Sequence, residues 1–585
     1  MNKKWIFGAC LSLGLCCSGF ARAEADWVER SNQYSQILLE TIAQLSPESA
    51  AEVGLTGFDN SIIDLKPGIN DRAIKGHKEA KAKLLKIKKK EKHPAVRQDL
   101  EILLTAIDDS LQQIALEQQY YFPYFDASEM IYDGLRGLLD HQNTPKQHKA
   151  ALVRLQRYTG MEIGYQPLTE LAKAEILRGL KQLGKSGPLK ESIEKDLENS
   201  ETLLKEIETL FTDFNVAGFE KPYSELKTQI RQYNDFLRSQ VLPRGRDDFK
   251  LPEEMYAFAL KEYGVDMPLD ELQRRAKVEF KQLQNTMQAQ AREIARQRGY
   301  ADNDYRAVLK SLKKQQITGE AILPFYHEKN DALEEIIRRE QIITLPERDL
   351  VIRLASAAES AQTPAPFMKP PRMIGNTGEV GEFVLPLKYP GAKDGQSLHI
   401  DDFTYEAAAW PLSAHEARPG HELQFASMVE KGVSTARMIF AFNSVNAEGW
   451  ALYMEEEIKP YLTLEGRFAT NWSRLIRAAR AFLDPGLNTG QISKAQALKV
   501  LKEDLVLSDA LATSELERYT FRGQGQATSY FVGYSRLMAL RAETELLLAD
   551  KFNRQAYHDF ILAQGLLPPV LLKKAVMTTF VDRYK

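Results

Sequence analysis

The chain has 585 residues, a formal net charge of −3 and 44% hydrophobic residues. A chain of this length can bury a large core without covalent cross-links, and its mild acidity argues against nucleic acid as a partner. All three cysteines lie within the first 17 residues, which excludes disulfides and cysteine ligands from the rest of the chain.

Residues 1–23 have the pattern of a secretory signal peptide. Two lysines precede an apolar stretch, and Ala21-Arg22-Ala23 fits a signal-peptidase cleavage site. The stretch is too short to favour a permanent membrane span. We therefore expect an exported protein, periplasmic or secreted, with no stable membrane insertion after cleavage. Cys16 and Cys17 suggest a lipoprotein as an alternative, but the residues before them are poor for lipobox cleavage.

Residues 24–363 are expected to form a helical N-terminal region. The pattern is mostly that of amphipathic helices, for example from Asp270 to Arg298, where apolar residues recur at helical spacing among charges. The lysine-rich segment 75–92 is interpreted as a solvated helix face. No repeat or low-complexity linker marks a boundary. The sequence thus predicts a mainly α-helical fold in a single large subunit, and indicates no oligomeric state.

The composition changes at residues 364–371, which contain four prolines. Residues 378–386 then resemble a short strand, which Pro386 would confine to a sheet edge. Residues 364–585 are expected to be continuous with the preceding fold, with a small β-sheet followed by four helices: His421–Lys431, Asn446–Ile458, Trp472–Asp484 and Thr528–Asp550.

Two histidines and two glutamates in the last third have the chemistry of a zinc site. His415 and His421 supply imidazoles, Glu416 follows the first of them, and Glu448 lies 27 residues after the second. Six residues on a straight helix correspond to about 240°, which would point the two rings nearly apart. Pro419 resolves this conflict, because it forces a kink or bulge that can bring both rings to one metal.

Four sequence blocks in this region resemble one bacterial family. They are His415-Glu-Ala-Arg-Pro-Gly-His421-Glu-Leu-Gln424, Glu448-Gly-Trp-Ala-Leu-Tyr-Met-Glu455, Arg477 to Asn488, and Glu517 to Tyr530. Together they resemble the bacterial proteins grouped as domain of unknown function 885, which look like zinc metallopeptidases of the gluzincin kind. The resemblance implies a substrate cleft, with the small sheet beside the metal-site helix.

The resemblance also implies roles for individual residues. His415, His421 and Glu448 would bind one Zn²⁺, and Glu416 would be the general base. Glu422 also follows a histidine but does not match the position of the family's glutamate. Residues 455–457 are interpreted as a solvated face.

Further residues are expected to act on the substrate. Tyr530 would donate a hydrogen bond to the developing oxyanion, with Tyr519 as substitute. Arg518 or Arg522 would hold a substrate carboxylate. Two positions depart from the family pattern: Asn488 replaces a histidine, and Gln524 replaces a proline. Asn488 is expected to contact substrate by a hydrogen bond without a charge.

The expected function is zinc-dependent hydrolysis of peptide bonds in short peptides, by an oligopeptidase or a carboxypeptidase-like enzyme. Two alternatives remain open at this stage. One is another zinc-dependent hydrolase acting on an amide or ester that is not a peptide. The other is a catalytically inactive peptide-binding protein.

Overall fold

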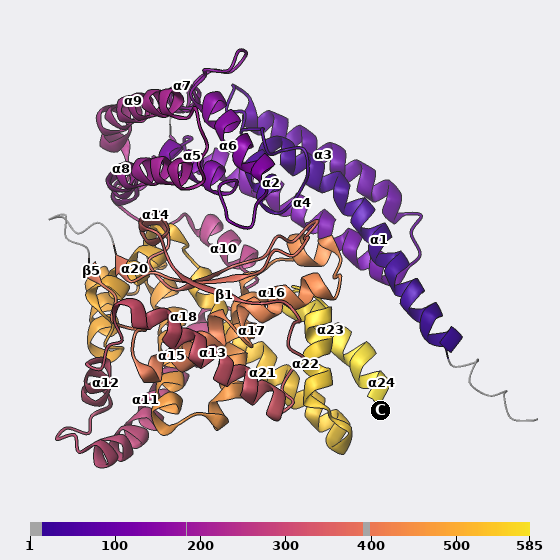
Figure 1. Ribbon diagram of the computed structural model, residues 1–585, viewed down its shortest axis with the longest axis vertical. Coiled ribbons are helices and arrows are strands. Elements are labelled where there is room, and N and C mark those ends of the chain that lie inside the picture. The colour runs from indigo at the N-terminus through magenta and orange to yellow at the C-terminus, as the bar shows by residue number, and fades with distance from the viewer. Residues whose placement is uncertain (1–13, 183, 390–397, 585) are drawn as a thin grey trace, which may run out of the picture.

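A computed structural model describes residues 14–182, 184–389 and 398–584 (Figure 1). The chain folds into two helical layers, with the N-terminal layer at the top of the view. The upper layer contains nine helices: α1 Gly14–Leu45, α2 Pro47–Glu52, α3 Ile69–Lys88, α4 Pro94–Tyr120, α5 Ala127–Arg136, α6 Pro145–Tyr158, α7 Leu168–Gly179, α8 Lys190–Asp213 and α9 Glu220–Phe236. The first 13 residues of the expected signal peptide lie outside the described residues, and residues 14–23 belong to α1.

The lower layer carries the remaining helices. Those before the histidine motif are α10 Glu253–Glu262, α11 Leu269–Arg298, α12 Tyr305–Lys313, α13 Ile322–Arg339 and α14 Ala357–Gln362. Those from the motif onward are α15 Glu406–Glu416, α16 His421–Glu430, α17 Ser444–Ile458, α18 Leu464–Asn488, α19 Lys494–Lys499, α20 Asp509–Glu517, α21 Ser529–Leu548, α22 Arg554–Ala563, α23 Pro569–Ala575 and α24 Asp582–Tyr584.

Each layer has a hydrophobic core of its own. One large cluster lies almost entirely within residues 65–241. Another joins residues 267–312 to residues 405–532. Within it, α11 and α18 form the most extensive helix–helix interface. Because this core extends on both sides of residue 363, α11 and α12 support the helices that carry the motif.

Helix α11 illustrates how local sequence sets these elements. Asp270 and Glu271 lie in its first turn, and Arg296 and Arg298 lie in its last. This distribution complements the helix dipole, which favours negative charge at the N-terminus and positive charge at the C-terminus. Leu272, Leu283, Met287 and Ile294 form part of its buried stripe. The charges at its ends and the spacing of its buried residues therefore favour the same helix.

A small sheet lies beside the motif helices. It contains β1 Val351–Leu354, β2 Phe367–Lys369 and β3 Glu382–Leu385, in the order β1-β3-β2. Strand β3 pairs in parallel with β1 and antiparallel with β2. Met368 of β2 packs against a hydrophobic cluster that includes Phe425 and Met428 of α16. A two-stranded pair, β4 Lys388–Tyr389 with β5 Leu398–His399, follows.

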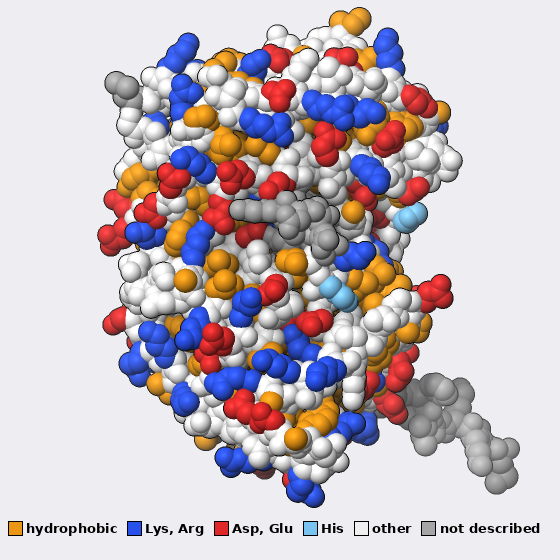
Figure 2. Space-filling model, turned by 90° about the vertical axis from the view of Figure 1, so that its left-hand side faces the viewer, with side chains coloured by type: hydrophobic (Ala, Val, Ile, Leu, Met, Phe, Trp, Pro, Cys, Tyr) orange, Lys and Arg blue, Asp and Glu red, His pale blue; other side chains and the backbone are white. Residues whose placement is uncertain are grey.

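The structure corrects the expectation that the strand after residue 378 lies at a sheet edge. Strand β3 is central, and Pro386 lies just beyond its last residue. The missing N–H of this proline therefore removes no hydrogen bond between the strands. Side chains of both charge signs are interspersed over the face shown in Figure 2. Within the described ranges, no helix is long and apolar enough to span a lipid bilayer.

Candidate metal centre

The chain breaks between the two motif histidines. Helix α15 ends at Glu416 and α16 begins at His421, so the expected kink is a complete interruption of the helix. The Arg418–Pro419 peptide within it is cis. Trp450 of α17 donates its indole N–H to the carbonyl oxygen of Pro419 at 3.1 Å. This contact ties the turn to the helix that carries Glu448.

Gly420 makes the tight turn possible. A Cβ at this position would lie 1.9 Å from the carbonyl oxygen of His415 and 2.4 Å from that of Ala414. No side chain can be accommodated at such distances. The backbone of residue 420 can therefore approach the end of α15 this closely only because the residue is glycine.

The turn brings both imidazoles to one carboxylate. The ring centroids of His415 and His421 are 4.8 Å apart and the rings are nearly perpendicular, at 84°. Their Nε2 atoms lie 3.4 and 3.2 Å from the same oxygen, Oε2 of Glu448. One ligand atom from each of the three side chains can be chosen so that all lie within 4.8 Å of one another. The geometry therefore assembles the three side chains expected from the sequence.

Close packing of two helices places Glu448. The next residue, Gly449, lies against Gly533 of α21, and a Cβ on Gly449 would be 2.5 Å from the Cα of Gly533. The backbones of α17 and α21 thus touch directly. Since Tyr530 is one turn before Gly533, this contact also fixes the separation between Glu448 and Tyr530.

A second carboxylate holds His415 from the other side. Glu455 is two turns along α17 from Glu448 and accepts a hydrogen bond from Nδ1 of His415 at 2.7 Å. Its side chain is fully buried, so the interpretation of residues 455–457 as a solvated face is wrong for Glu455. The spacing of seven residues, which puts Glu448 and Glu455 on one helix face, is the signal that could have identified it.

The buried charges shift one another's pKa. Burial lowers the pKa of His415, but hydrogen bonds to Glu448 and Glu455 outweigh it and raise this pKa to about 9. Burial raises the pKa of Glu448, yet the two imidazoles hold it well below its usual range. The cluster therefore keeps the partly buried carboxylate of Glu448 ionised, as a metal ligand must be.

Glu416 and Glu422 have different surroundings. Glu416 is buried, lies 4.0 Å from Nε2 of His415 and lines a cavity beside the motif. Burial raises its pKa, and the two histidines partly offset the rise. Glu422 accepts a hydrogen bond from Nε of Arg418 at 2.7 Å and does not line the cavity. Of the two motif glutamates, Glu416 and Glu422, only Glu416 lines the cavity.

The cavity has a volume of about 60 Å³, enough for a few water molecules. Tyr530 lies on its wall with its ring stacked near that of His415, at 6.2 Å between centroids. Burial raises the pKa of Tyr530, as does the charge of Glu448, so its hydroxyl remains protonated. Arg518 also lines the cavity and donates to the hydroxyl of Tyr530 at 3.3 Å.

Two further arginines of the cavity wall were not expected at the site. The i, i+4 spacing of Arg480 and Asp484 suggested a structural helix pair, but Arg480 pairs with Glu515 instead. Arg477 and Arg480 lie on α18, and their guanidinium carbons are 5.7 and 4.5 Å from the centre of the Tyr530 ring. Their spacing of three residues places both on one helix face. That spacing is the signal by which the sequence could have identified them as a pair.

Three other expected residues do not reach the cavity. Tyr519 is fully buried and donates its hydroxyl to Glu515 at 2.5 Å. Arg522 donates to Glu517 and to the backbone of Gln362. Asn488 donates to the side chain and backbone of Asp484 and to the backbone of Tyr519. The expected substrate contacts of Tyr519 and Asn488 therefore have no counterpart in this arrangement.

The two departures from the family pattern contact each other. The side-chain amide of Gln524 donates to the side-chain oxygen of Asn488 and to the backbone oxygen of Phe249. With this bond, both ends of the buried Asn488 amide have partners. The replacements thus form one hydrogen-bonded unit.

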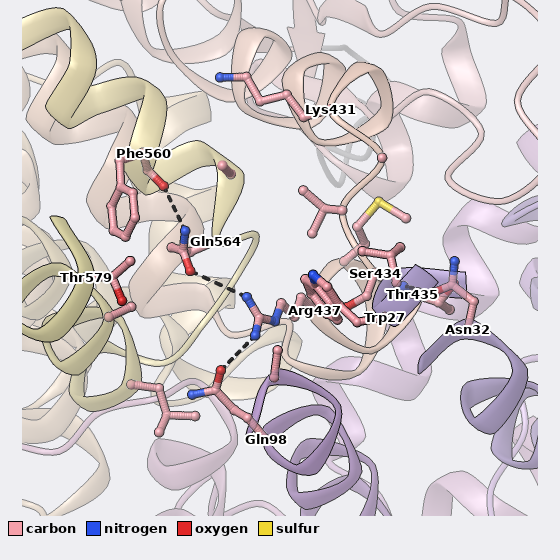
Figure 3. Close-up of a pocket in the computed structure, with 18 of the residues that line it drawn as sticks. Trp27, Asn32, Gln98, Lys431, Ser434, Thr435, Arg437, Phe560, Gln564 and Thr579 are labelled. Atoms are coloured by element: carbon pink, nitrogen blue, oxygen red, sulfur yellow. Dashed lines mark hydrogen bonds between the residues drawn. The ribbon is translucent and has the colours of Figure 1, made fainter. Parts of the chain in front are cut away.

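A much larger hollow than this cavity lies elsewhere in the described part of the chain (Figure 3). It is a groove of about 1980 Å³ between α1, α4, the segment after α16 and the C-terminal helices. Arg437 crosses it with hydrogen bonds to Gln98 and Gln564. The histidine motif does not line this groove, so size alone would have pointed away from the candidate metal centre.

Comparison with known proteins supports the fold. A model of the family described as "Bacterial protein of unknown function (DUF885)" matches residues 47–576. A structure described as a "putative lipoprotein of unknown function" from Shewanella oneidensis is 19% identical, with a TM-score of 0.70. A "putative lipoprotein" from Colwellia psychrerythraea is 16% identical, with a TM-score of 0.71. Each alignment covers 94% of this chain and 99% of the other. No curated protein gives a significant match.

Proposed function

The chain belongs to the DUF885 family of bacterial proteins of unknown function, and we propose that it is an exported, zinc-dependent peptidase acting on short peptides. The observation that carries this proposal is the convergence of three ligand atoms, from His415, His421 and Glu448, within 4.8 Å of one another. Beside them lies Glu416, a carboxylate that faces a cavity.

The donor set fits zinc rather than a harder cation. Two imidazoles and one carboxylate are the ligands of catalytic zinc sites that leave one position for water or substrate. Calcium and magnesium prefer oxygen ligands throughout. The hydrogen bond from Nδ1 of His415 to Glu455 leaves its Nε2 available and increases its basicity as a ligand.

The metal and three residues, Glu416, Tyr530 and Arg518, would carry the chemistry. Bound zinc would polarise the scissile carbonyl and promote ionisation of the attacking water. Glu416 would take a proton from that water and deliver it to the leaving amine. The hydroxyl of Tyr530 would donate a hydrogen bond to the oxygen that becomes negative in the tetrahedral intermediate, supported by Arg518 behind it.

The small cavity restricts the substrate. A volume of about 60 Å³ holds no amino-acid residue, so a peptide enters only when the lining residues move apart. Such a site excludes folded proteins and favours short, extended peptides. Exclusion of water around the reacting groups also strengthens their electrostatic interactions.

Export is supported by two observations. Residues 1–23 have the pattern of a signal peptide, and the two similar structures are described as putative lipoproteins. Mass spectrometry of the mature protein distinguishes the two routes. Cleavage before Glu24 gives an unmodified N-terminus, whereas cleavage before Cys16 or Cys17 gives a lipid-modified one.

The decisive experiment combines zinc content with peptide cleavage. We expect about one zinc per wild-type chain, lost in His421→Ala and Glu448→Ala but kept in Glu416→Gln and in the control Glu406→Ala. A library of short peptides should be cleaved by wild type and not by Glu416→Gln. Wild type that binds no zinc would overturn the proposal in favour of a peptide-binding protein. Zinc binding with cleavage of esters or other amides, but not peptides, would leave a different hydrolase.

A further inference from the structure

The wall of the catalytic cavity carries a concentration of positive charge. Three arginines line it: Arg477 and Arg480 from α18, and Arg518 from the π-helical segment Arg518–Arg522 that follows α20. All three surround Tyr530: two stand over its ring and the third donates to its hydroxyl. Because the same ring lies beside His415, the arginines lie about one side chain away from the candidate metal centre.

Neighbouring carboxylates balance this charge only in part. Glu515 accepts two hydrogen bonds from Arg480, at 2.8 and 2.6 Å. The same carboxylate is 4.0 Å from Arg518 and also accepts from Tyr519. Arg518 is thus left without a close carboxylate of its own among the described residues.

Arg477 is in a similar position. Its nearest carboxylate oxygen, on Glu455, is 3.8 Å away and already accepts from His415. Its Nε is buried without a hydrogen-bond partner in the described part of the chain. A buried donor of this kind costs free energy unless a ligand or water satisfies it. The Nε of Arg477 is therefore available to a ligand, although another of its nitrogens already donates to Ser473. Within the ranges that the structure describes, Arg518 has no close carboxylate to compete with a ligand.

We propose that Arg477 and Arg518 form a subsite for the α-carboxylate at the C-terminus of a peptide substrate, which makes this protein a carboxypeptidase. The inference rests on the proposed peptidase function. A guanidinium group binds a carboxylate through paired hydrogen bonds. One tyrosine ring separates the arginines from His415. Once the lining residues have moved apart to admit a peptide, this separation corresponds to a single residue between the bound carboxylate and the scissile bond.

The rest of the cavity wall suits an apolar C-terminal residue. Its apolar lining includes Leu412, Trp472, Ile476 and Leu511. In the reaction, water adds to the carbonyl carbon and the C–N bond of the last peptide link breaks. The proton that Glu416 takes from water goes to the leaving nitrogen. The products are a free amino acid and a peptide shorter by one residue.

A side-chain carboxylate in the middle of a peptide has the same chemistry as the α-carboxylate. The test therefore uses three N-terminally blocked peptides with the zinc-loaded protein: one ending in a free leucine, the same peptide as its C-terminal amide, and an amide with glutamate in place of that leucine. We expect release of leucine from the free acid, and at least about a tenfold lower kcat/KM for both amides.

The variants test the arginine itself. Arg518→Ala should lower kcat for all three peptides, because Arg518 supports the hydroxyl of Tyr530. For the free acid alone it should also raise KM, so that kcat/KM falls about 10- to 100-fold further than for the amides. Arg522→Ala is the matched control, since its side chain bonds to Glu517 and Gln362 outside the cavity, and it should behave as wild type.

Each contrary result has a separate meaning. Equal cleavage of the free acid and the leucine amide by wild type would overturn the carboxylate subsite while leaving the peptidase function intact, and this comparison needs no variant. Cleavage of the glutamate amide as fast as the free acid would assign the subsite to an acidic side chain instead. Cleavage of no peptide by zinc-loaded protein would overturn the peptidase function, and the inference with it.

Discussion

Nδ1 of His415 donates to Oε1 of Glu455 at 2.7 Å, and neither side chain exposes more than 2% of its surface to solvent. The carboxylate therefore fixes both the tautomer and the orientation of the ring, so that Nε2 is presented to Glu448. Glu455 supports the site through His415 and has no direct contact with substrate.

Replacing this carboxylate should weaken metal binding. We expect Glu455→Gln to reduce zinc affinity about 10- to 100-fold, because the amide is a weaker acceptor and no longer increases the basicity of the ring. Zinc affinity can be measured by competition with a chromophoric chelator. Glu457→Gln, on the same helix but paired with Arg541, is the control. Equal affinities in both variants would show that Glu455 has no influence on the metal.

Removing the hydroxyl of Tyr530 should affect catalysis more than binding. We expect Tyr530→Phe to lower kcat about 10²- to 10³-fold, with zinc content unchanged, because the oxyanion loses a hydrogen bond made in the transition state. Tyr534→Phe, one turn further along α21, is the control. An unchanged kcat in Tyr530→Phe would assign the oxyanion contact to another donor, with Arg518 the nearest.

Separating α17 from α21 should disrupt the site at a distance. In Gly449→Ala the new methyl group would lie 2.5 Å from the Cα of Gly533, so the helices must move apart. We expect a loss of about 1–3 kcal/mol in the free energy of unfolding, together with weaker zinc binding. Urea unfolding and zinc content check this. Gly76→Ala, in a helix of the other layer, should leave zinc content unchanged, and a normal site in Gly449→Ala would contradict the argument.

Acid should destabilise the fold through His558. Burial, reinforced by the charges of Arg541 and Arg554, lowers the pKa of this histidine to about 3. The folded state then binds its proton less readily than the unfolded state, whose pKa is near 6.5. The associated stability is present above pH 6.5 and is lost progressively as the pH falls towards 3.

The size of this effect can be measured. Between pH 6.5 and pH 5 it amounts to about 2 kcal/mol, and His558→Gln should lack this part of the pH dependence. Urea unfolding at the two pH values provides the comparison. A wild type and a variant that lose stability in parallel over this range would show that other groups cause the acid sensitivity.

Much of the helical fold could be predicted from sequence. The helices expected at residues 421–431 and 446–458 begin and end within two residues of α16 and α17. Apolar residues at helical spacing and polar caps such as Asn443 before α17 are local signals. The small sheet was expected too, but its order was not, because strand pairing depends on residues far apart in the chain.

The candidate site shows the same division. The grouping of His415, His421 and Glu448 could be predicted, because their residue types and the Pro-Gly pair fit one shared site. The burial of Glu455 and the placement of Arg477 could not, since both depend on how α15, α17 and α18 pack together. Tyr519 and Asn488 looked suited to substrate, but Glu515 and Asp484 occupy their polar groups.

The hydrogen bond between Asn488 and Gln524 couples two positions that are far apart in the sequence, so we expect them to change together in evolution. Changing either residue alone would leave the buried amide of the other without its hydrogen-bond partner, which lowers the free energy of unfolding by about 1–3 kcal/mol. Relatives that carry the histidine of the family pattern at the first position should therefore seldom carry glutamine at the second. Sorting family sequences by the residues at both positions would therefore separate a branch that has this hydrogen-bond arrangement next to α18. Comparing each position by itself would treat the two replacements as unrelated.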